Sequence, residues 1–187
     1  MMKTKLFIIG LLFIPLFTYA STEVGLVPST SNIQEGSSFT VDLKISVSKT
    51  PINTIDGIIV YDASKLEVKD VNTDGSMLSI WPKPANFDNT KGEVSFVGGT
   101  NKGFVGENSQ VLKITFLAKK SGQAKIDFRD SFAVYQDDGK GTLINPWLQP
   151  TEVNISAFTG GFPWKIISLI LLVLVIVFIA KRYVKSK

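Results

Sequence analysis

Apolar and polar side chains alternate along most of the middle of the chain, with the two-residue period of a half-buried β-strand. The clearest run covers residues 39–47, in which every second residue is apolar. The same alternation recurs at residues 112–118, 124–128 and 153–155. Residues 55–61 are more continuously apolar, which predicts a central strand covered on both faces. The period of two indicates strands throughout, and no helical period is sustained between the first run and the last.

Short turn signals separate these runs, each built from glycine or a small polar residue. They are Glu35-Gly36, Asp62-Ala63-Ser64, Thr73-Asp74-Gly75, Lys91-Gly92, Gly98-Gly99, Ser121-Gly122 and Asp138-Gly139-Lys140-Gly141. Eight or nine short strands at this spacing favour an all-β domain, either a β-sandwich or a jelly roll. We expect one such domain over residues 21–158, because this length suits a single core.

The N-terminal segment has the features of a secretory signal peptide. Lys3 and Lys5 precede an apolar run at residues 6–17, and a small residue, Ala20, closes the segment. A charged start, a short apolar centre and a small residue at the exit predict a signal peptide over residues 1–20, cleaved after Ala20. An uncleaved anchor helix is the alternative.

A second apolar segment lies near the C-terminus and predicts a membrane-spanning helix. Residues 166–180 carry no charge, but as a helix they would extend only about 22 Å, short of the ~30 Å hydrocarbon core. Adding residues 162–165 extends the helix to about 28 Å, with Trp164 suited to the membrane interface. We therefore expect a transmembrane helix over residues 164–180.

The residues that flank this helix set its predicted orientation. Residues 159–163 include Gly160-Gly161 and form a short linker. Four basic residues fall within residues 181–187, which marks this tail as cytoplasmic. The sequence therefore predicts a single-pass plasma-membrane protein whose β-domain lies outside the cell.

Charge and composition narrow the classes of function. The chain has a net charge of +4, but residues 21–158 hold thirteen basic and sixteen acidic residues, a net charge of −3. This acidic balance argues against nucleic-acid binding. The chain has no Cys and no His, which excludes disulfides, thiol or histidine catalysis and Cys/His zinc sites. Carboxylate pairs remain for catalysis, but the sequence nominates none; we predict no enzyme, no catalytic residue, no metal and no cofactor.

The order of the runs resembles that of cohesin domains. The resemblance lies in the hallmark stretch Ile55-Asp56-Gly57-Ile58-Ile59-Val60-Tyr61-Asp62-Ala63-Ser64-Lys65-Leu66-Glu67-Val68, where an apolar strand ends in Tyr-Asp and Leu-Glu-Val opens the next strand. Residues 92–96 are similar to the middle strand of the family, 111–126 to its late strand pair, and 132–142 to its last loop. Residues 36–47 fit the first part of the fold.

This resemblance implies a fold and a partner. Cohesins are nine-stranded jelly rolls that share their fold with carbohydrate-binding modules. They bind dockerins, small calcium-loaded helical modules, and so assemble polysaccharide-degrading complexes. In the best-known class an Asn-x-Asp motif contacts the dockerin; here Asp56 matches and Thr54 departs from it. The acidic residue expected after the middle strand is also absent from residues 97–101.

Three aromatic residues are further candidates for ligand binding. Trp81 and Trp147 lie in proline-containing segments and Phe87 follows the first of these. Sugar rings stack on flat aromatic faces, so each residue is a candidate platform for a polysaccharide; the alternative is that the rings cap the open ends of the sandwich. Asp137 and Asp138 could hold calcium, or could form a solvated turn.

Two functions from different classes follow. The first is a non-catalytic, cell-surface binding module for a dockerin-like protein or a polysaccharide. The second is a structural or adhesive envelope protein that associates with itself through its β-sandwich.

Overall fold

A computed structural model describes residues 22–158 and 167–176. The predicted signal peptide, the linker, the basic tail and both ends of the predicted membrane helix lie outside the described residues. Residues 167–176 are helical. Within the described ranges, no helix is both long enough and apolar enough to cross a membrane.

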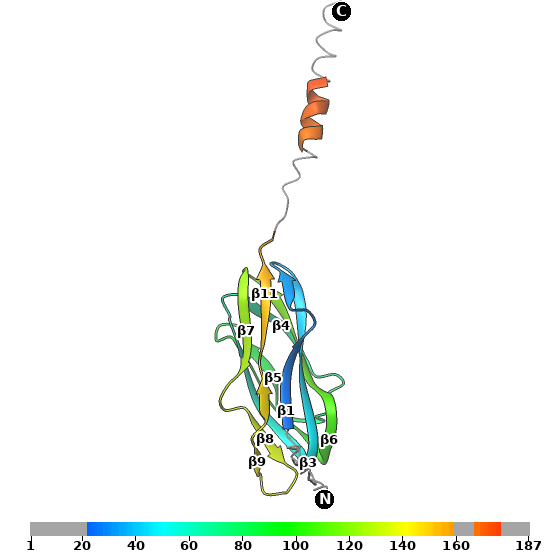
Figure 1. Ribbon diagram of the computed structural model, residues 1–187, viewed down its shortest axis with the longest axis vertical. Helices are drawn as coiled ribbons and strands as arrows, with labels where there is room; N and C mark the ends of the chain where they lie inside the picture. The colour runs from blue at the N-terminus through cyan, green and yellow to red at the C-terminus, as the bar shows by residue number, and fades with distance from the viewer. Residues whose placement is uncertain (1–21, 159–166, 177–187) are drawn as a thin grey trace, which may run out of the picture.

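The first described range contains eleven β-strands. They are β1 (Thr22–Pro28), β2 (Asn32–Gln34), β3 (Ser38–Tyr61), β4 (Leu66–Asn72), β5 (Ile80–Asp88), β6 (Glu93–Ala118), β7 (Gly122–Phe128), β8 (Ala133–Gln136), β9 (Leu143–Ile144), β10 (Trp147–Gln149) and β11 (Thr151–Ser156). Together they form an elongated sandwich in which β1 begins at one end and β11 finishes at the other (Figure 1).

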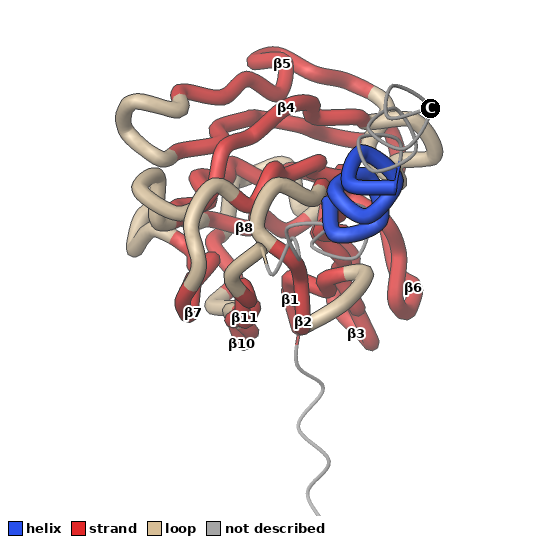
Figure 2. The backbone as a smooth tube through the Cα atoms, turned by 90° about the horizontal axis from the view of Figure 1, so that it is seen from above, coloured by secondary structure: helices blue, strands red, loops and turns tan. Residues whose placement is uncertain are grey.

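The long strands β3 and β6 pair with each other along most of their length and belong to both layers of the sandwich. The first half of β3 pairs with β1 and with the second half of β6, so the first sheet has the order β10-β1-β3-β6-β4. The second half of β3 pairs with the first half of β6, which β5 borders. On its other side β3 pairs with β7 and β8, beyond which lie β11, β2 and β9. Figure 2 shows these strands around the interior, viewed from above.

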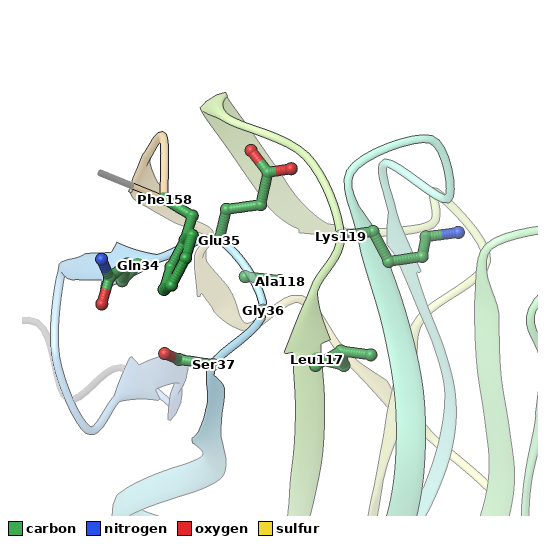
Figure 3. A pocket seen from close by; sticks show the side chains of 8 residues that line it. All are labelled: Gln34, Glu35, Gly36, Ser37, Leu117, Ala118, Lys119 and Phe158. Atoms are coloured by element: carbon green, nitrogen blue, oxygen red, sulfur yellow. The ribbon is translucent and has the colours of Figure 1, made fainter. Parts of the chain in front are cut away.

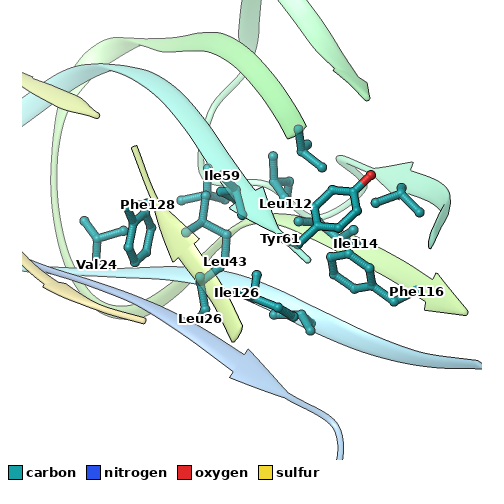
Figure 4. Packing of buried hydrophobic residues seen from close by; sticks show 14 of the residues in the cluster. Val24, Leu26, Leu43, Ile59, Tyr61, Leu112, Ile114, Phe116, Ile126 and Phe128 are labelled. Atoms are coloured by element: carbon teal, nitrogen blue, oxygen red, sulfur yellow. The ribbon is translucent and has the colours of Figure 1, made fainter. Parts of the chain in front are cut away.

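The apolar side chains at alternate strand positions form the core, because every second side chain points into the sandwich. Phe116 is fully buried; its ring stacks on that of Phe39 with 5.6 Å between centroids and forms a T-shaped pair with that of Tyr61 at 5.2 Å. Figure 4 shows Phe116 and Tyr61 packed among aliphatic side chains from both sheets. Within the described ranges, the buried apolar residues all lie between Val24 and Ile155, so residues 22–158 contain a hydrophobic core of their own.

The fold confirms the predicted all-β sandwich and corrects two details. The described residues form eleven strands rather than nine: β2, β9 and β10, of three residues or fewer, are additional short strands at the sheet edges, whereas β3 and β6 each continue through both sheets as one strand. The expectation that residues 55–61 are covered on both faces is wrong. Ile59 is fully buried, whereas Ile58 and Val60 point to the opposite side and remain half-buried. Their surface is partly open to solvent, so this apolar run marks an outer face.

Candidate binding face on the second sheet

Strand register places one set of side chains on the outer face of the second sheet. Paired residues point to the same side of a sheet, and Ile55, Ile59, Val94 and Phe96 point inward. The alternate positions therefore form rows across β5, β6, β3 and β8 or β7. These rows are Ile80–Gly99–Thr54–Tyr135, Lys83–Val97–Asp56–Ala133, Asn86–Ser95–Ile58 and Asp88–Glu93–Val60–Asp127. This set is called the binding face below.

The binding face has three apolar residues at its centre, next to the acidic Asp56, and further charges around them. Ile58, Val60 and Val97 are half-buried in adjacent rows, where a partner could cover them and remove apolar surface from water. At the rim the Arg129 guanidinium donates to the Glu93 carboxylate. An apolar centre with a polar rim is the usual plan of a protein interface.

Asp56 is the acidic residue at the centre of this face. Its side chain is exposed, beside Val97 on one neighbouring strand and Ala133 on the other. Among the described residues it makes no hydrogen bond or ion pair, in contrast to Glu93 at the rim. An exposed carboxylate of this kind can accept a charge-assisted hydrogen bond from a partner.

The outer face of the first sheet has a different chemistry. On β3 the outward positions there are polar, and include Asp42, Lys44 and Ser46. The Lys113 ammonium on β6 lies 3.8 Å from the Asp42 carboxylate. Alternation thus gives the two halves of β3 different outer faces: the first half is polar, and the second half is mixed, with Thr54 and Asp56 followed by two apolar residues.

Two glycines allow aromatic rings to lie directly beneath the binding face. A Cβ at Gly57 would be 2.5 Å from the Phe96 ring and 2.9 Å from Phe132. A Cβ at Gly98 would be 2.6 Å from Leu78 and 3.0 Å from Trp81. A larger residue at Gly57 would displace the Phe96 ring, and one at Gly98 would displace the Leu78 side chain. The two glycines therefore determine how closely these side chains pack beneath the face.

The turn that follows β3 contains the most strongly perturbed carboxylate. The Asp62 carboxylate accepts hydrogen bonds from the Lys65 ammonium at 2.8 Å and from the Ser64 backbone at 3.0 Å. The hydrogen bonds from Lys65 and Ser64 lower the pKa of Asp62 to about 2. This geometry fixes the Tyr-Asp turn at the end of the strand that carries Asp56.

The four residues nominated from sequence lie in three different places. Asp56 is on the binding face. Trp81 is half-buried and its ring lies 6.0 Å from that of Phe96, while Phe87 pairs with Val94 and packs against the core. Trp147 is 62% exposed on β10, at the edge of the first sheet. The structure therefore does not bring the three aromatic candidates together.

The acidic turn at Asp137 and Asp138 is occupied by bonds within the chain. Asp137 accepts a hydrogen bond from the Asn53 amide at 3.0 Å, and Asp138 accepts one from the Lys140 backbone at 2.9 Å. In the part of the chain that the structure describes, no group of three or more acidic residues is placed to hold a metal ion.

Two hollows were not anticipated from sequence. One, of about 480 Å³, adjoins the binding face where Tyr135 points outward, and Phe132, Leu143 and Pro146 also line it. In the sequence, only the proline-containing segment Asn145-Pro146-Trp147 marked this region as a loop. A second, of about 540 Å³, lies at the end of the sandwich, where Phe158 stands beside Gln34 and Ser37 (Figure 3).

Fold and face together define a β-sandwich module with a partly apolar outer face on one sheet. The cohesin domain model matches residues 25–145, which is more than half of the chain, and the chain belongs to the cohesin domain family. Cohesin modules are non-catalytic binding domains. No curated protein matches the chain.

Solved cohesin structures share the fold at low sequence identity. The sixth cohesin of scaffoldin B from Acetivibrio cellulolyticus, solved in complex with a dockerin, is 17% identical with a TM-score of 0.61; the match covers 73% of this chain and 99% of that one. A cohesin module of a family 33 glycoside hydrolase from Clostridium perfringens is 16% identical with a TM-score of 0.60, covering 74% and 98%. A non-cellulosomal cohesin from the archaeon Archaeoglobus fulgidus is 16% identical with a TM-score of 0.61, covering 73% and 92%.

Proposed function

We propose that this chain is a cell-surface receptor module that holds a dockerin-type protein on the binding face. The observation that carries the proposal is the chemistry of that face, where Ile58, Val60 and Val97 are half-buried around the exposed Asp56. Membership in the cohesin family supports it, as do solved relatives in complex with dockerins.

The face favours a partner with one apolar side that ends in a hydrogen-bond donor. The apolar side would cover Ile58, Val60 and Val97, which gains from removing these side chains from water. A hydroxyl or ammonium group would bond to Asp56. An amphipathic helix supplies both features on one surface.

The test compares two arginine substitutions on the same strand. Val97→Arg would put a charge into the centre of the binding face, whereas Leu117→Arg would put one on the outer face of the first sheet, at a position that is also half-buried. We expect the full chain in detergent to bind at least one member of a calcium-loaded dockerin panel by calorimetry. Val97→Arg abolishes that binding and Leu117→Arg leaves it unchanged. Equal losses in both variants, or no binding to any dockerin, would refute the proposal.

The surface location belongs to the same proposal. The N-terminal signal-like segment and the uncharged run at residues 166–180 support export followed by anchoring. The apolar side chains from Leu169 to Ile176 are each at least half exposed, as a segment that contacts lipid requires. We expect the full chain to sediment with membranes in carbonate wash and the fragment of residues 21–158 to stay in solution. Recovery of the full chain in the soluble fraction would contradict the anchor.

The residues at one edge of the second sheet favour partner binding over the alternative function, self-association. At the β5 edge of the second sheet stand Pro82 and Pro84, which have no backbone N–H to pair with another copy. Sedimentation velocity of the fragment should therefore give a monomer. A stable dimer would favour the structural role.

A further inference from the structure

Trp147 is the most exposed tryptophan among the described residues, and the binding face does not use it. Its side chain is 62% exposed on β10, which pairs in parallel with β1. The next residue, Leu148, lies opposite Val24 and packs against the core. Trp147 therefore points the other way, onto the outer face of the first sheet.

Strand register gives the indole a set of polar neighbours. Trp147 lies opposite Glu23, which lies opposite Ser46. In the next row Gln149 lies opposite Gly25, which lies opposite Lys44. The Gln149 amide stands 3.4 Å from the Glu23 carboxylate, so a donor and an acceptor lie side by side next to the ring.

Gly25 has no side chain, so the surface between the neighbouring side chains is shallow. A Cβ there would meet nothing closer than Gln149, at 3.8 Å, so the position is open rather than crowded. The result is a shallow platform with the indole on one side, amide and carboxylate in the middle and Ser46 and Lys44 on the far side. The charges of Glu23 and Lys44 offset each other, which favours an uncharged ligand.

We propose that this platform binds a neutral polysaccharide. A pyranose ring presents a flat face of C–H groups that packs on an exposed indole, and adjacent hydroxyls can donate to Glu23 and accept from Gln149 at the same time. Because the platform lies on the sheet opposite the binding face, the module can hold a glycan chain and a protein partner together. The site does not depend on the dockerin proposal.

The experiment is affinity electrophoresis of the full chain in detergent through gels that contain hydroxyethyl cellulose, β-glucan, xylan or the acidic polymer pectin. We expect retardation in at least one neutral gel and none in pectin.

Trp147→Ala weakens the retardation about tenfold, and Glu23→Gln weakens it less. Leu143→Ala is the matched control, because Leu143 is also 62% exposed but belongs to the second sheet. Dockerin binding by Trp147→Ala stays unchanged. Free migration in every neutral gel, retardation in pectin alone, or equal retardation of Trp147→Ala and the unchanged chain would overturn the proposal.

Discussion

The hydroxyl of Tyr61 donates a hydrogen bond to the side-chain oxygen of Asn89, 2.7 Å away. The same amide accepts a bond from the Val68 backbone N–H at 2.7 Å and donates one to the Val68 carbonyl at 3.0 Å. Tyr61 ends β3, Val68 lies on β4 and Asn89 follows β5. One asparagine therefore ties together the ends of strands from both sheets, next to the turn that Asp62 closes.

Replacing Asn89 by alanine should destabilise the domain more strongly than is usual for a substitution at a partly exposed position. The substitution removes three hydrogen bonds and leaves the Val68 backbone groups without these partners, so we expect a loss of about 2–3 kcal/mol in the free energy of unfolding. Urea denaturation followed by tryptophan fluorescence measures it. Asn101→Ala, an exposed change with no such bonds, should stay within about 0.5 kcal/mol. Similar losses in the two variants would contradict the assigned role.

Alkaline pH should weaken the fold through Tyr61. Burial of the phenol raises its pKa from 10.0 to about 12, so between these values the folded state holds a proton that the unfolded chain has released. The resulting stabilisation is complete below pH 10 and is lost as the pH rises through 12. We expect the difference in unfolding free energy between the unchanged chain and Tyr61→Phe to narrow over this window. A difference that stays constant from pH 9 to pH 12 would show that the phenol titrates normally.

The substitution Gly57→Ala tests the support of the binding face. Its new methyl group would stand 2.5 Å from the Phe96 ring, and overpacking of this kind costs about 1–3 kcal/mol. Gly25→Ala is the control, since it also lies in a strand and meets nothing within 3.8 Å. Thermal unfolding should give a lower Tm for the first variant and an unchanged or higher Tm for the second.

The Asp62 carboxylate should be protonated, and its turn should lose the hydrogen bonds to it, at a lower pH than ordinary carboxylates are protonated. Hydrogen bonds from Lys65 and Ser64 lower its pKa to about 2 from 3.8. The folded state therefore binds fewer protons than the unfolded chain, and the contribution to stability is present above pH 3.8 and lost as the pH falls through 2. Carbon-detected NMR titration of the Asp62 carboxyl group should give a midpoint near 2. In Lys65→Met the midpoint should rise toward 3.8; an unchanged midpoint would exclude Lys65 as the main cause.

Strand positions could be predicted from sequence wherever one side of a strand is buried. Residues 39–47 alternate, and the structure buries the apolar set as expected. Residues 55–61 were misread, because a half-buried apolar residue on an open face has the same identity as one in the core. Ile58 and Ile59 are the same residue type, and only the layer of side chains beneath Ile59 distinguishes them.

The candidate site residues also divide into those that could be identified from the sequence and those that could not. Asp56 could be nominated from its place in the hallmark stretch, since that argument depends only on local order along the chain. The roles of Trp81 and Trp147 could not be separated, because each is a tryptophan beside proline. Trp81 packs on Phe96, which is fifteen residues away in the sequence, whereas Trp147 points outward because β10 pairs with β1 at the far end of the chain.

The sequence by itself determined that this chain forms strands, which residues along them are apolar, and which chemistry is absent, since these follow from side-chain identity and a period of two. Tertiary structure decided which apolar residues become core and which become an outer face. It also decided that β3 and β6 pass through both sheets and which tryptophan reaches solvent. Those outcomes depend on pairing between segments up to 126 residues apart, such as Glu23 with Gln149, and local pattern carries no information on such distant partners.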